Sequence, residues 1–74
     1  MRVDTIRVFL RAMPFKPFVI HLSDGARFVV PHPDFVSVSH GLIVVSQAPG
    51  SRGHRLRTTT CDALHVTRIE VVEA

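Results

Sequence analysis

Cys61, Asp62 and His65 lie close together in the chain, and they carry the types of side chain that nucleophilic catalysis requires. A cysteine nucleophile needs a base beside it and a third group that orients that base. No nucleophile motif surrounds Cys61, however, and a chain of 74 residues has little room for a substrate pocket. We therefore predict a small buried cysteine at this position and no enzymatic activity.

The histidines are the next candidates, because imidazole is a common metal ligand. They are His21, His32, His40, His54 and His65. No two of them stand at the short paired spacing that zinc sites use. We interpret them as surface and turn residues, with a site built from two or three of them as the alternative. The sequence thus predicts neither a metal ion nor another cofactor.

The densest group of basic side chains lies within residues 52–57, in a chain whose formal net charge is +3. This group consists of Arg52, His54, Arg55 and Arg57. In a strand, Arg55 and Arg57 would share one face and could contact phosphates. A solvated loop is the alternative interpretation. All the aromatic residues are phenylalanines at or before position 35, so the group lacks neighbouring rings on which bases could stack.

The length of the chain limits how these groups can be held in place. We expect one domain, residues 1–74, which buries about 60–65% of the surface of its unfolded chain. A single cysteine cannot form an internal disulfide, which fits a cytoplasmic protein. The hydrophobic content of 46% favours a homo-oligomer. Residues 3–13 are too short and too charged for a membrane span or a signal peptide, so no membrane partner is predicted.

An N-terminal helix is predicted at about residues 4–13. Asp4 can cap its first turn, and Pro14 ends it because proline lacks a backbone donor. Its apolar residues recur at helical spacing, and they are Val3, Ile6, Phe9, Leu10 and Met13. Arg7 and Arg11 share a different face of this helix. We expect two later phenylalanines, Phe15 and Phe18, to dock the helix onto the rest of the fold.

From residue 18 the apolar period changes to two, which predicts strands. The turn at Ser23-Asp24-Gly25 can close as a loop of two or of three residues. A three-residue loop, with Gly25 in the left-handed conformation, pairs Ile20 with Phe28 and keeps the apolar side chains on one face. We therefore predict the three-residue loop.

A second hairpin is predicted by the same reasoning. The proline-rich stretch 31–34 forms a turn before a strand at 36–39. A three-residue loop at Ser39-His40-Gly41 would pair Val38 with Leu42. Because the following strand is continuously apolar, we expect it to be buried on both faces, by the helix or by a neighbouring subunit.

The rest of the chain predicts a strand at 55–60, a single helical turn at 62–65 and a last strand at 66–72. A bend or bulge is expected inside the last strand, because Val66 and Ile69 would point to opposite faces of a regular strand. The predicted fold is mainly β with one N-terminal α-helix, and its strands form a small, strongly bent, five-stranded antiparallel barrel at about 17–72. An open sheet covered by the helix is the alternative.

The order of these elements and three short stretches resemble a known family. The stretches are Leu22-Ser23-Asp24-Gly25, Asp34-Phe35-Val36 and Leu64-His65-Val66-Thr67-Arg68-Ile69. They are similar to those of the Sm-like bacterial RNA chaperones of the Hfq type. The chain also resembles small bacterial proteins of no assigned function that carry a Pro-Phe-x-Pro-Phe segment, an Asp-Gly turn and a His-Pro pair.

The Sm-like resemblance implies an Sm- or SH3-like barrel, subunits joined strand to strand into a ring, and RNA bound at the central pore. It implies that Phe35 stacks on bases, that His65 lines the pore and that Arg7 and Arg11 form a basic rim. The chain departs from the family in four respects, one of which is that its Pro31–Pro33 stretch is shorter than the family's. Leu64 stands where the family has a lysine, the second strand lacks the glycine that bends it, and the helix lacks the RNA-contacting glutamine.

Two functions are compatible with these observations. The first is an RNA-binding, Sm-like oligomer whose contact residues are Phe35, His65, Arg7, Arg11, Arg55 and Arg57. The second is a protein-interaction or scaffold module with an SH3-like barrel, which the high apolar fraction and the modest charge favour.

Overall fold

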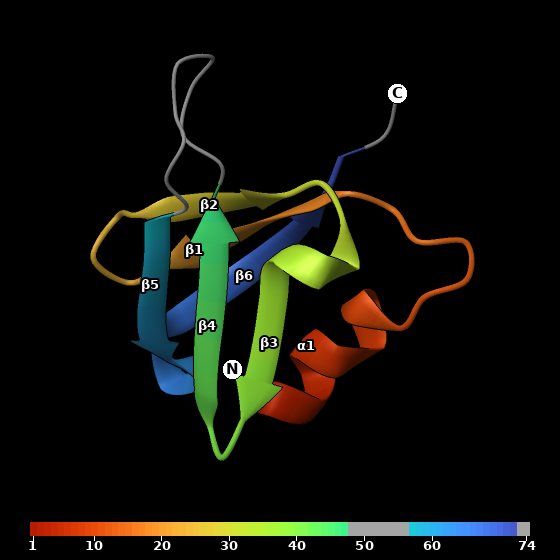
Figure 1. Ribbon diagram of the computed structural model, residues 1–74. Coiled ribbons are helices and arrows are strands. Elements are labelled where there is room, and N and C mark those ends of the chain that lie inside the picture. Colours follow the sequence, from red (N-terminus) through yellow and green to blue (C-terminus); the bar gives the residue numbers. More distant parts are fainter. Residues whose placement is uncertain (48–56, 73–74) are drawn as a thin grey trace.

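The computed structural model describes residues 1–47 and 57–72, and it is mainly β with one short N-terminal helix (Figure 1). Its helical elements are α1 (Val3–Leu10) and the two 3-10 turns, η1 (Pro33–Phe35) and η2 (Ala63–His65). Its strands are β1 (Phe18–Leu22), β2 (Arg27–Val30), β3 (Val36–Ser39), β4 (Leu42–Gln47), β5 (Arg57–Asp62) and β6 (Val66–Val71). The predicted fold class, mainly β with an N-terminal helix, is confirmed.

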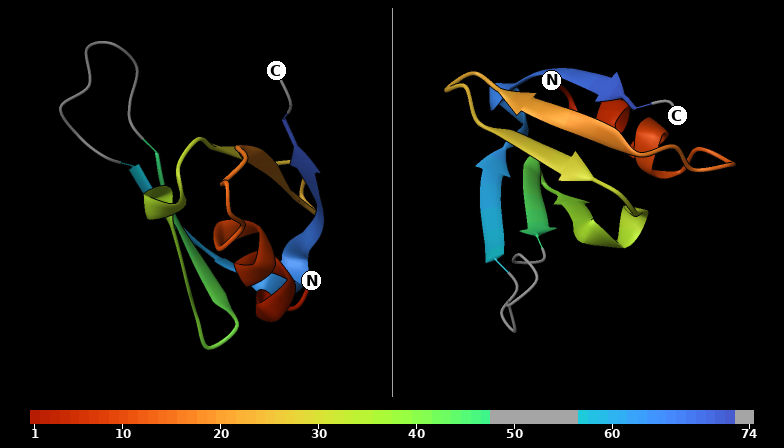
Figure 2. Two further views of the ribbon diagram at one scale, coloured as in Figure 1. Left: turned by 90° about the vertical axis from the view of Figure 1, so that its right-hand side faces the viewer. Right: turned by 90° about the horizontal axis from the view of Figure 1, so that it is seen from above.

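The described strands number six and form two antiparallel sheets, in the orders β2-β1-β6 and β3-β4-β5. The strands of one sheet cross those of the other (Figure 2). The described residues therefore do not form a closed barrel, and the predicted five-stranded barrel is not confirmed. The cause lies between β2 and β3, where Pro31 and Pro33 lack backbone donors and the turn η1 interrupts the ladder.

The hairpin of β1 and β2 has the predicted register. Gly25 closes its loop with a φ of 91°, in the left-handed region that glycine enters without a steric penalty. Phe18 pairs with Val30, and Ile20 pairs with Phe28. The inward side chains of this hairpin consequently gather on the face that meets the other sheet.

The hairpin of β3 and β4 differs from the prediction by one residue. Its loop contains two residues, His40 and Gly41, whose φ angles are 51° and 79°. Positive φ at both positions is the geometry of a type I′ turn, which matches the twist of the flanking strands. Val38 therefore pairs with Ile43, and the predicted pairing of Val38 with Leu42 is wrong.

This register gives β4 one buried and one open face. Ile43 and Val45 are each 1% exposed, whereas Leu42 is 45% exposed and Val44 is half-buried. Within one chain, therefore, the helix does not bury the second face of β4 as expected, and burial by a neighbouring subunit stays a prediction. The helix α1 packs against β3, and no second layer of the described residues covers the outer face of β4.

The end of the chain contains the predicted helical turn and the predicted irregularity. The turn η2 joins β5 to β6. In β6, Thr67 is an extra residue, because its neighbours Arg68 and Val66 pair with two consecutive residues of β1. Such a β-bulge changes which parity faces inward, so that Val66 and Ile69 both reach the core.

Helix α1 begins at Val3 and ends at Leu10, so it stops three residues before the predicted end at Met13. Pro14 cannot donate to the carbonyl of Leu10, and Met13 is 93% exposed with nothing to cover it. The predicted cap is wrong as well. The N-cap residue is Arg2, which makes no side-chain cap, and Asp4 lies inside the first turn.

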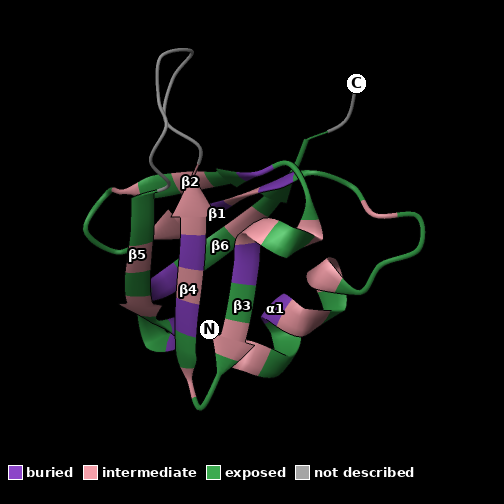
Figure 3. Cartoon of the chain, viewed as in Figure 1, coloured by how far each residue is buried: buried purple, intermediate pink, exposed green. Residues whose placement is uncertain are grey.

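Phe18 connects the helix to the sheets. Its ring centroid lies 5.8 Å from that of Phe9 and 5.9 Å from that of Phe15, and the Phe15 ring is 6.4 Å from the ring of His32. The predicted docking role of Phe15 and Phe18 is thus confirmed. The buried side chains of the described residues form one cluster (Figure 3), composed of Ile6, Phe18, Ile20, Val30, Val36, Ile43, Val45, Ala63 and Val66.

Candidate ligand-binding cleft

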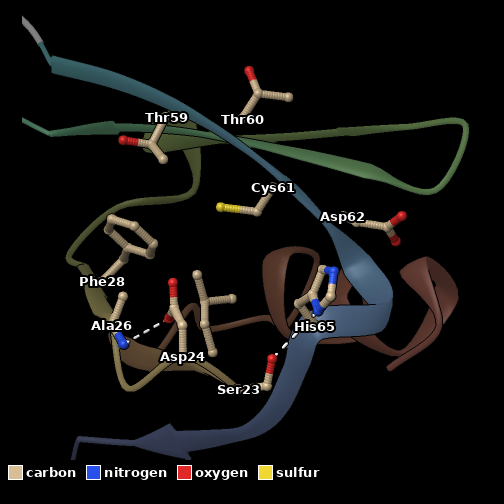
Figure 4. A pocket seen from close by; sticks show the side chains of 10 residues that line it. Ser23, Asp24, Ala26, Phe28, Thr59, Thr60, Cys61, Asp62 and His65 are labelled. Atoms are coloured by element: carbon tan, nitrogen blue, oxygen red, sulfur yellow. Dashed lines mark hydrogen bonds between the residues drawn. The ribbon is translucent and has the colours of Figure 1, made fainter.

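A cleft of about 540 Å³ lies between β2 and β5, which are edge strands of different sheets (Figure 4). One wall consists of Leu22 at the end of β1, Ser23 and Asp24 of the loop, Ala26 just before β2, and Phe28 of β2. Residues 59–62 of β5 and His65 of η2 form the opposite wall. The cleft therefore brings the three chemically active residues near the end of the chain together with the first loop.

The alternation of β5 decides which of its side chains enter the cleft. Thr59 and Cys61 are half-buried, whereas Thr60 and Asp62 are exposed. In Figure 4 the sulfur of Cys61 points across the cleft toward Phe28, and the side chains of Thr60 and Asp62 point away from it. The polar groups that β5 presents to the cleft are thus the hydroxyl of Thr59 and the thiol of Cys61.

The loop before β2 is attached to η2 by hydrogen bonds at both backbone and side chain. The backbone N–H of Ser23 donates to the carbonyl of His65 at 2.7 Å, and Ser23 Oγ lies 3.3 Å from His65 Nδ1. Asp24 Oδ1 accepts the backbone N–H of Ala26 at 2.9 Å. These bonds hold the Asp24 carboxylate at the cleft and occupy one nitrogen of the histidine.

The environment of Cys61 keeps its thiol neutral. Burial raises the pKa of the Cys61 thiol above its ordinary value, and the negative charge of Asp24 raises it further. A thiolate is the reactive form of cysteine, so this arrangement disfavours nucleophilic attack. The cleft is therefore better suited to binding a ligand than to covalent chemistry.

Sequence reasoning identified Cys61 and His65 but missed Asp24, Phe28 and Thr59 as their neighbours. The parity of each strand contained part of the information, because Phe28 shares its face with Ile20 and Thr59 shares its face with Cys61. That β2 and β5 face each other across a cleft is a property of the tertiary fold, and no local pattern signals it.

The structure does not bring Phe35 and His65 together within one chain. Phe35 belongs to η1, before β3, and β3 begins opposite Val45 near the end of β4. His65 belongs to η2, after β5, and β5 ends opposite Leu42 at the beginning of β4. The two turns are therefore offset by three residues along β4, roughly 10 Å, and they lie on opposite sides of that strand.

The basic residues predicted to contact RNA are also dispersed. Arg7 Nη1 lies 3.2 Å from Asp4 Oδ1, and Arg11 follows the end of the same helix. That helix packs against β3, one edge of the second sheet, while Arg57 begins β5 at the opposite edge. Arg55 lies outside the described residues.

A row of basic side chains on the first sheet was missed by sequence reasoning. His21 pairs with Arg27 on one side and with Arg68 on the other, so the three lie side by side across β2, β1 and β6. His21 Nε2 lies against the carboxylate of Glu70 without the alignment of a hydrogen bond, and Arg68 Nε is 3.4 Å from the same carboxylate oxygen. We call these three residues the basic row.

Within residues 1–47 and 57–72, no three side chains of the His, Cys, Asp and Glu types gather closely enough to hold a metal ion. The helices of the same part of the chain all fall short of the length and hydrophobicity that crossing a membrane requires. Comparisons with family models, with curated proteins and with solved structures find no match for this chain. The resemblance to the Sm-like family therefore stays a prediction.

Proposed function

We propose that this protein is a small cytoplasmic binding module of the Sm-like type, which joins edge to edge into a homo-oligomer and binds RNA. The pair of long edge strands, β5 and β6, carries the proposal. Among the described residues, β5 pairs with β4 alone and β6 pairs with β1 alone. The N-terminal ammonium group donates to the carbonyl of Val66, at the start of β6. Apart from that carbonyl, no described strand covers the outer edges of β5 and β6, and these edges are open to pairing with another chain.

The order of the strands supports such an assembly. β2 and β3 follow one another with the turn η1 between them, so they can be counted as one interrupted strand. The two sheets then read β6-β1-β2/β3-β4-β5, with one long free edge at each end. Pairing β5 of one copy with β6 of the next is a head-to-tail contact, and it produces a ring if the rotation closes.

Exposed apolar side chains on β6 favour the same contact. Val71 is 38% exposed, and Val72, which follows the strand, is 50% exposed. A neighbouring strand would remove both from water and contribute to association.

RNA is the proposed ligand because basic side chains gather on one face. Arg27, His21 and Arg68 form the basic row, and two arginines of that row are exposed. Phosphate groups attract such a row, and the net charge of +3 acts in the same direction. The basic row replaces the proposed pore pair of Phe35 and His65, which lie too far apart in one chain.

A protein partner is the second candidate, favoured by apolar residues beside the N-terminus. Leu64 is 77% exposed and Leu42 is 45% exposed, and both line a cavity of about 360 Å³ with Val3. Exposed apolar groups of this kind are typical of protein-binding surfaces. The scaffold function would use this cavity rather than the basic row.

Light scattering on the purified protein tests the assembly. A homo-oligomer gives a multiple of 8.2 kDa. Lysines at Thr60 and Val71, in the variant Thr60→Lys/Val71→Lys, should dissociate it, because charge on an edge strand opposes edge pairing. The control, Ser37→Lys/Ser39→Lys, places the same two positive charges on exposed positions of β3 and should leave the mass unchanged. A wild-type chain that is monomeric at every concentration contradicts the proposal.

Fluorescence anisotropy with labelled poly(U) and poly(A) oligomers, titrated at several salt concentrations, tests the ligand. Affinity should fall steeply with salt, because phosphate contacts release counterions. Arg27→Gln/Arg68→Gln should weaken binding about tenfold, and Arg7→Gln/Arg11→Gln, with the same change in charge, should weaken it less. Affinity that does not depend on salt, together with a nuclease-insensitive pull-down of one protein, would favour the scaffold function.

A further inference from the structure

We propose that the cleft between β2 and β5 binds a small organic cation with an aromatic or apolar body, such as an arylalkylamine. The cleft shares strand β5 with the proposed edge contact, but its lining contains no residue of the basic row. Its proposed ligand does not depend on the proposed function. The argument uses its volume, its lining and its charge.

The volume and walls of the cleft suit a small organic molecule. About 540 Å³ falls within the range of ordinary ligand pockets, which are mostly apolar with a few polar groups. Leu22, Ala26 and Phe28 supply apolar walls on one side. On the other side, β5 adds the hydroxyl of Thr59 and the thiol of Cys61.

The charge of the lining selects a cation. Among the described residues, the ionisable side chains that line the cleft are Asp24, Asp62, Cys61 and His65, with no lysine or arginine. In Figure 4 the side chain of Asp24 rises into the space below Cys61, whereas Asp62 points outward. Asp24 Oδ1 is committed to the N–H of Ala26, so the other carboxylate oxygen is the one that a ligand's ammonium group would meet.

Phe28 adds a second element of recognition for a cation. Its ring lies beside the space between Asp24 and Cys61 in Figure 4. An ammonium group near the ring face is attracted by the negative charge of the π-system, and an aromatic body can stack against the same ring. A carboxylate ligand would instead be repelled by Asp24.

The state of Cys61 agrees with a partly buried, negatively charged interior. Burial and the charge of Asp24 both raise the pKa of its thiol, which means that both act at the position of the sulfur. A neutral thiol can contact an apolar ligand body without adding a second negative charge. No covalent step is part of the proposal.

NMR titration of the full chain tests the site, since amide shifts report binding residue by residue. Three probes of similar size separate charge from shape: phenethylamine, 2-phenylethanol and 3-phenylpropionate. Phenethylamine should shift the amides of residues 22–28 and 59–65, and it should bind more tightly than the neutral alcohol. The anionic probe should not bind.

Two substitutions locate the charge that is responsible. Asp24→Asn keeps the side-chain acceptor for the Ala26 N–H and removes the charge, so it should weaken phenethylamine about fivefold and leave 2-phenylethanol unchanged. Asp34→Asn is the matched control, because it makes the same change in the distant turn η1 and should alter neither affinity.

Three outcomes would overturn the proposal. The first is the absence of amide shifts in the cleft at the highest soluble concentration of phenethylamine. The second is equal binding of all three probes. The third is a loss of affinity in Asp34→Asn as large as that in Asp24→Asn, which would show a general charge effect rather than a site.

Discussion

Both hairpins of the molecule have a glycine in the loop, but the two loops differ in length and in backbone geometry. In the first, β1–β2, three residues form the loop, and Gly25 alone has a positive φ. In the second, β3–β4, two residues form the loop, and His40 and Gly41 both have positive φ. The first loop also contains Asp24, whose carboxylate stabilises it and reaches the cleft, whereas the second has no such bond.

The difference teaches what determines the register of a hairpin. In β1 the inward positions are apolar and His21 occupies an outward position, so one register buries the apolar set and the other does not. In β4, residues 42–45 are apolar at both parities, and burial alone cannot choose between them. The geometry of the turn then decides, and two left-handed residues select the two-residue loop.

The largest expected effect comes from side chains whose burial depends on the register of the second hairpin. Ile43→Ala should lower the free energy of unfolding by about 3 kcal/mol, because Ile43 is 1% exposed. Leu42→Ala should lower it by less than about 1 kcal/mol, because Leu42 is 45% exposed. Urea unfolding measures both, with Ile20→Ala as the reference in the first hairpin. A larger loss for Leu42 would contradict the two-residue loop.

A smaller effect is expected from the two glycines. Gly25→Ala and Gly41→Ala should each cost about 1–2 kcal/mol, because an L-residue is strained at positive φ. A Cβ atom would meet nothing within 4 Å at either position, so the cost is conformational and not steric. Thermal unfolding of the two variants should give similar losses. An unchanged midpoint in either variant would mean that its loop is not left-handed.

A stabilising change is expected in the second loop alone. His40→Asn should raise the free energy of unfolding by about 0.5 kcal/mol, because asparagine tolerates positive φ better than histidine does and Asn-Gly is a favoured type I′ pair. Asp24→Asn in the first loop should bring no gain, because no residue but glycine has positive φ there. Equal gains in both variants would remove the proposed distinction between the loops.

The last prediction concerns alkaline pH and the first loop. Alkylation of Cys61 by iodoacetamide should accelerate with a midpoint above 9.0, and Asp24→Asn should lower that midpoint, while His40→Asn should not. Folding raises the pKa of this thiol. The stability of the protein should therefore be unaffected at pH values below the thiol's pKa in the unfolded chain, and it should fall as the pH rises through the thiol's pKa in the folded protein. A midpoint at 9.0 in the wild-type protein would contradict the raised pKa of Cys61, and an unchanged midpoint in Asp24→Asn would contradict the influence of Asp24.

Much of the fold could be predicted where the sequence has a single pattern. The clean alternation from Phe18 to Val30 predicted the first register, and the change of parity between Val66 and Ile69 predicted the bulge at Thr67. The end of helix α1 was misplaced, because helical spacing continues to Met13 although nothing covers that residue. A sequence pattern shows the period at which apolar residues recur. Whether another part of the chain covers those residues depends on the rest of the fold.

The candidate site was less accessible to prediction. Pairing Phe35 with His65 depended on family resemblance, and the antiparallel pairing of β4 places their turns on opposite sides of that strand. The basic row of His21, Arg27 and Arg68 required knowing that β6 pairs with β1, a contact between residues far apart in the chain. Such long-range pairing follows from the whole topology and not from local spacing.

The aromatic contacts around Phe18 have a consequence for the cooperativity of unfolding. Helix α1 has eight residues, too few to persist alone in water, and its Phe9 ring rests on Phe18 in the centre of the core. Undocking the helix would uncover a side chain on which both sheets depend. Amide hydrogens of α1 should therefore exchange with solvent by global opening, at rates close to those of the amides of β1, rather than by independent fraying.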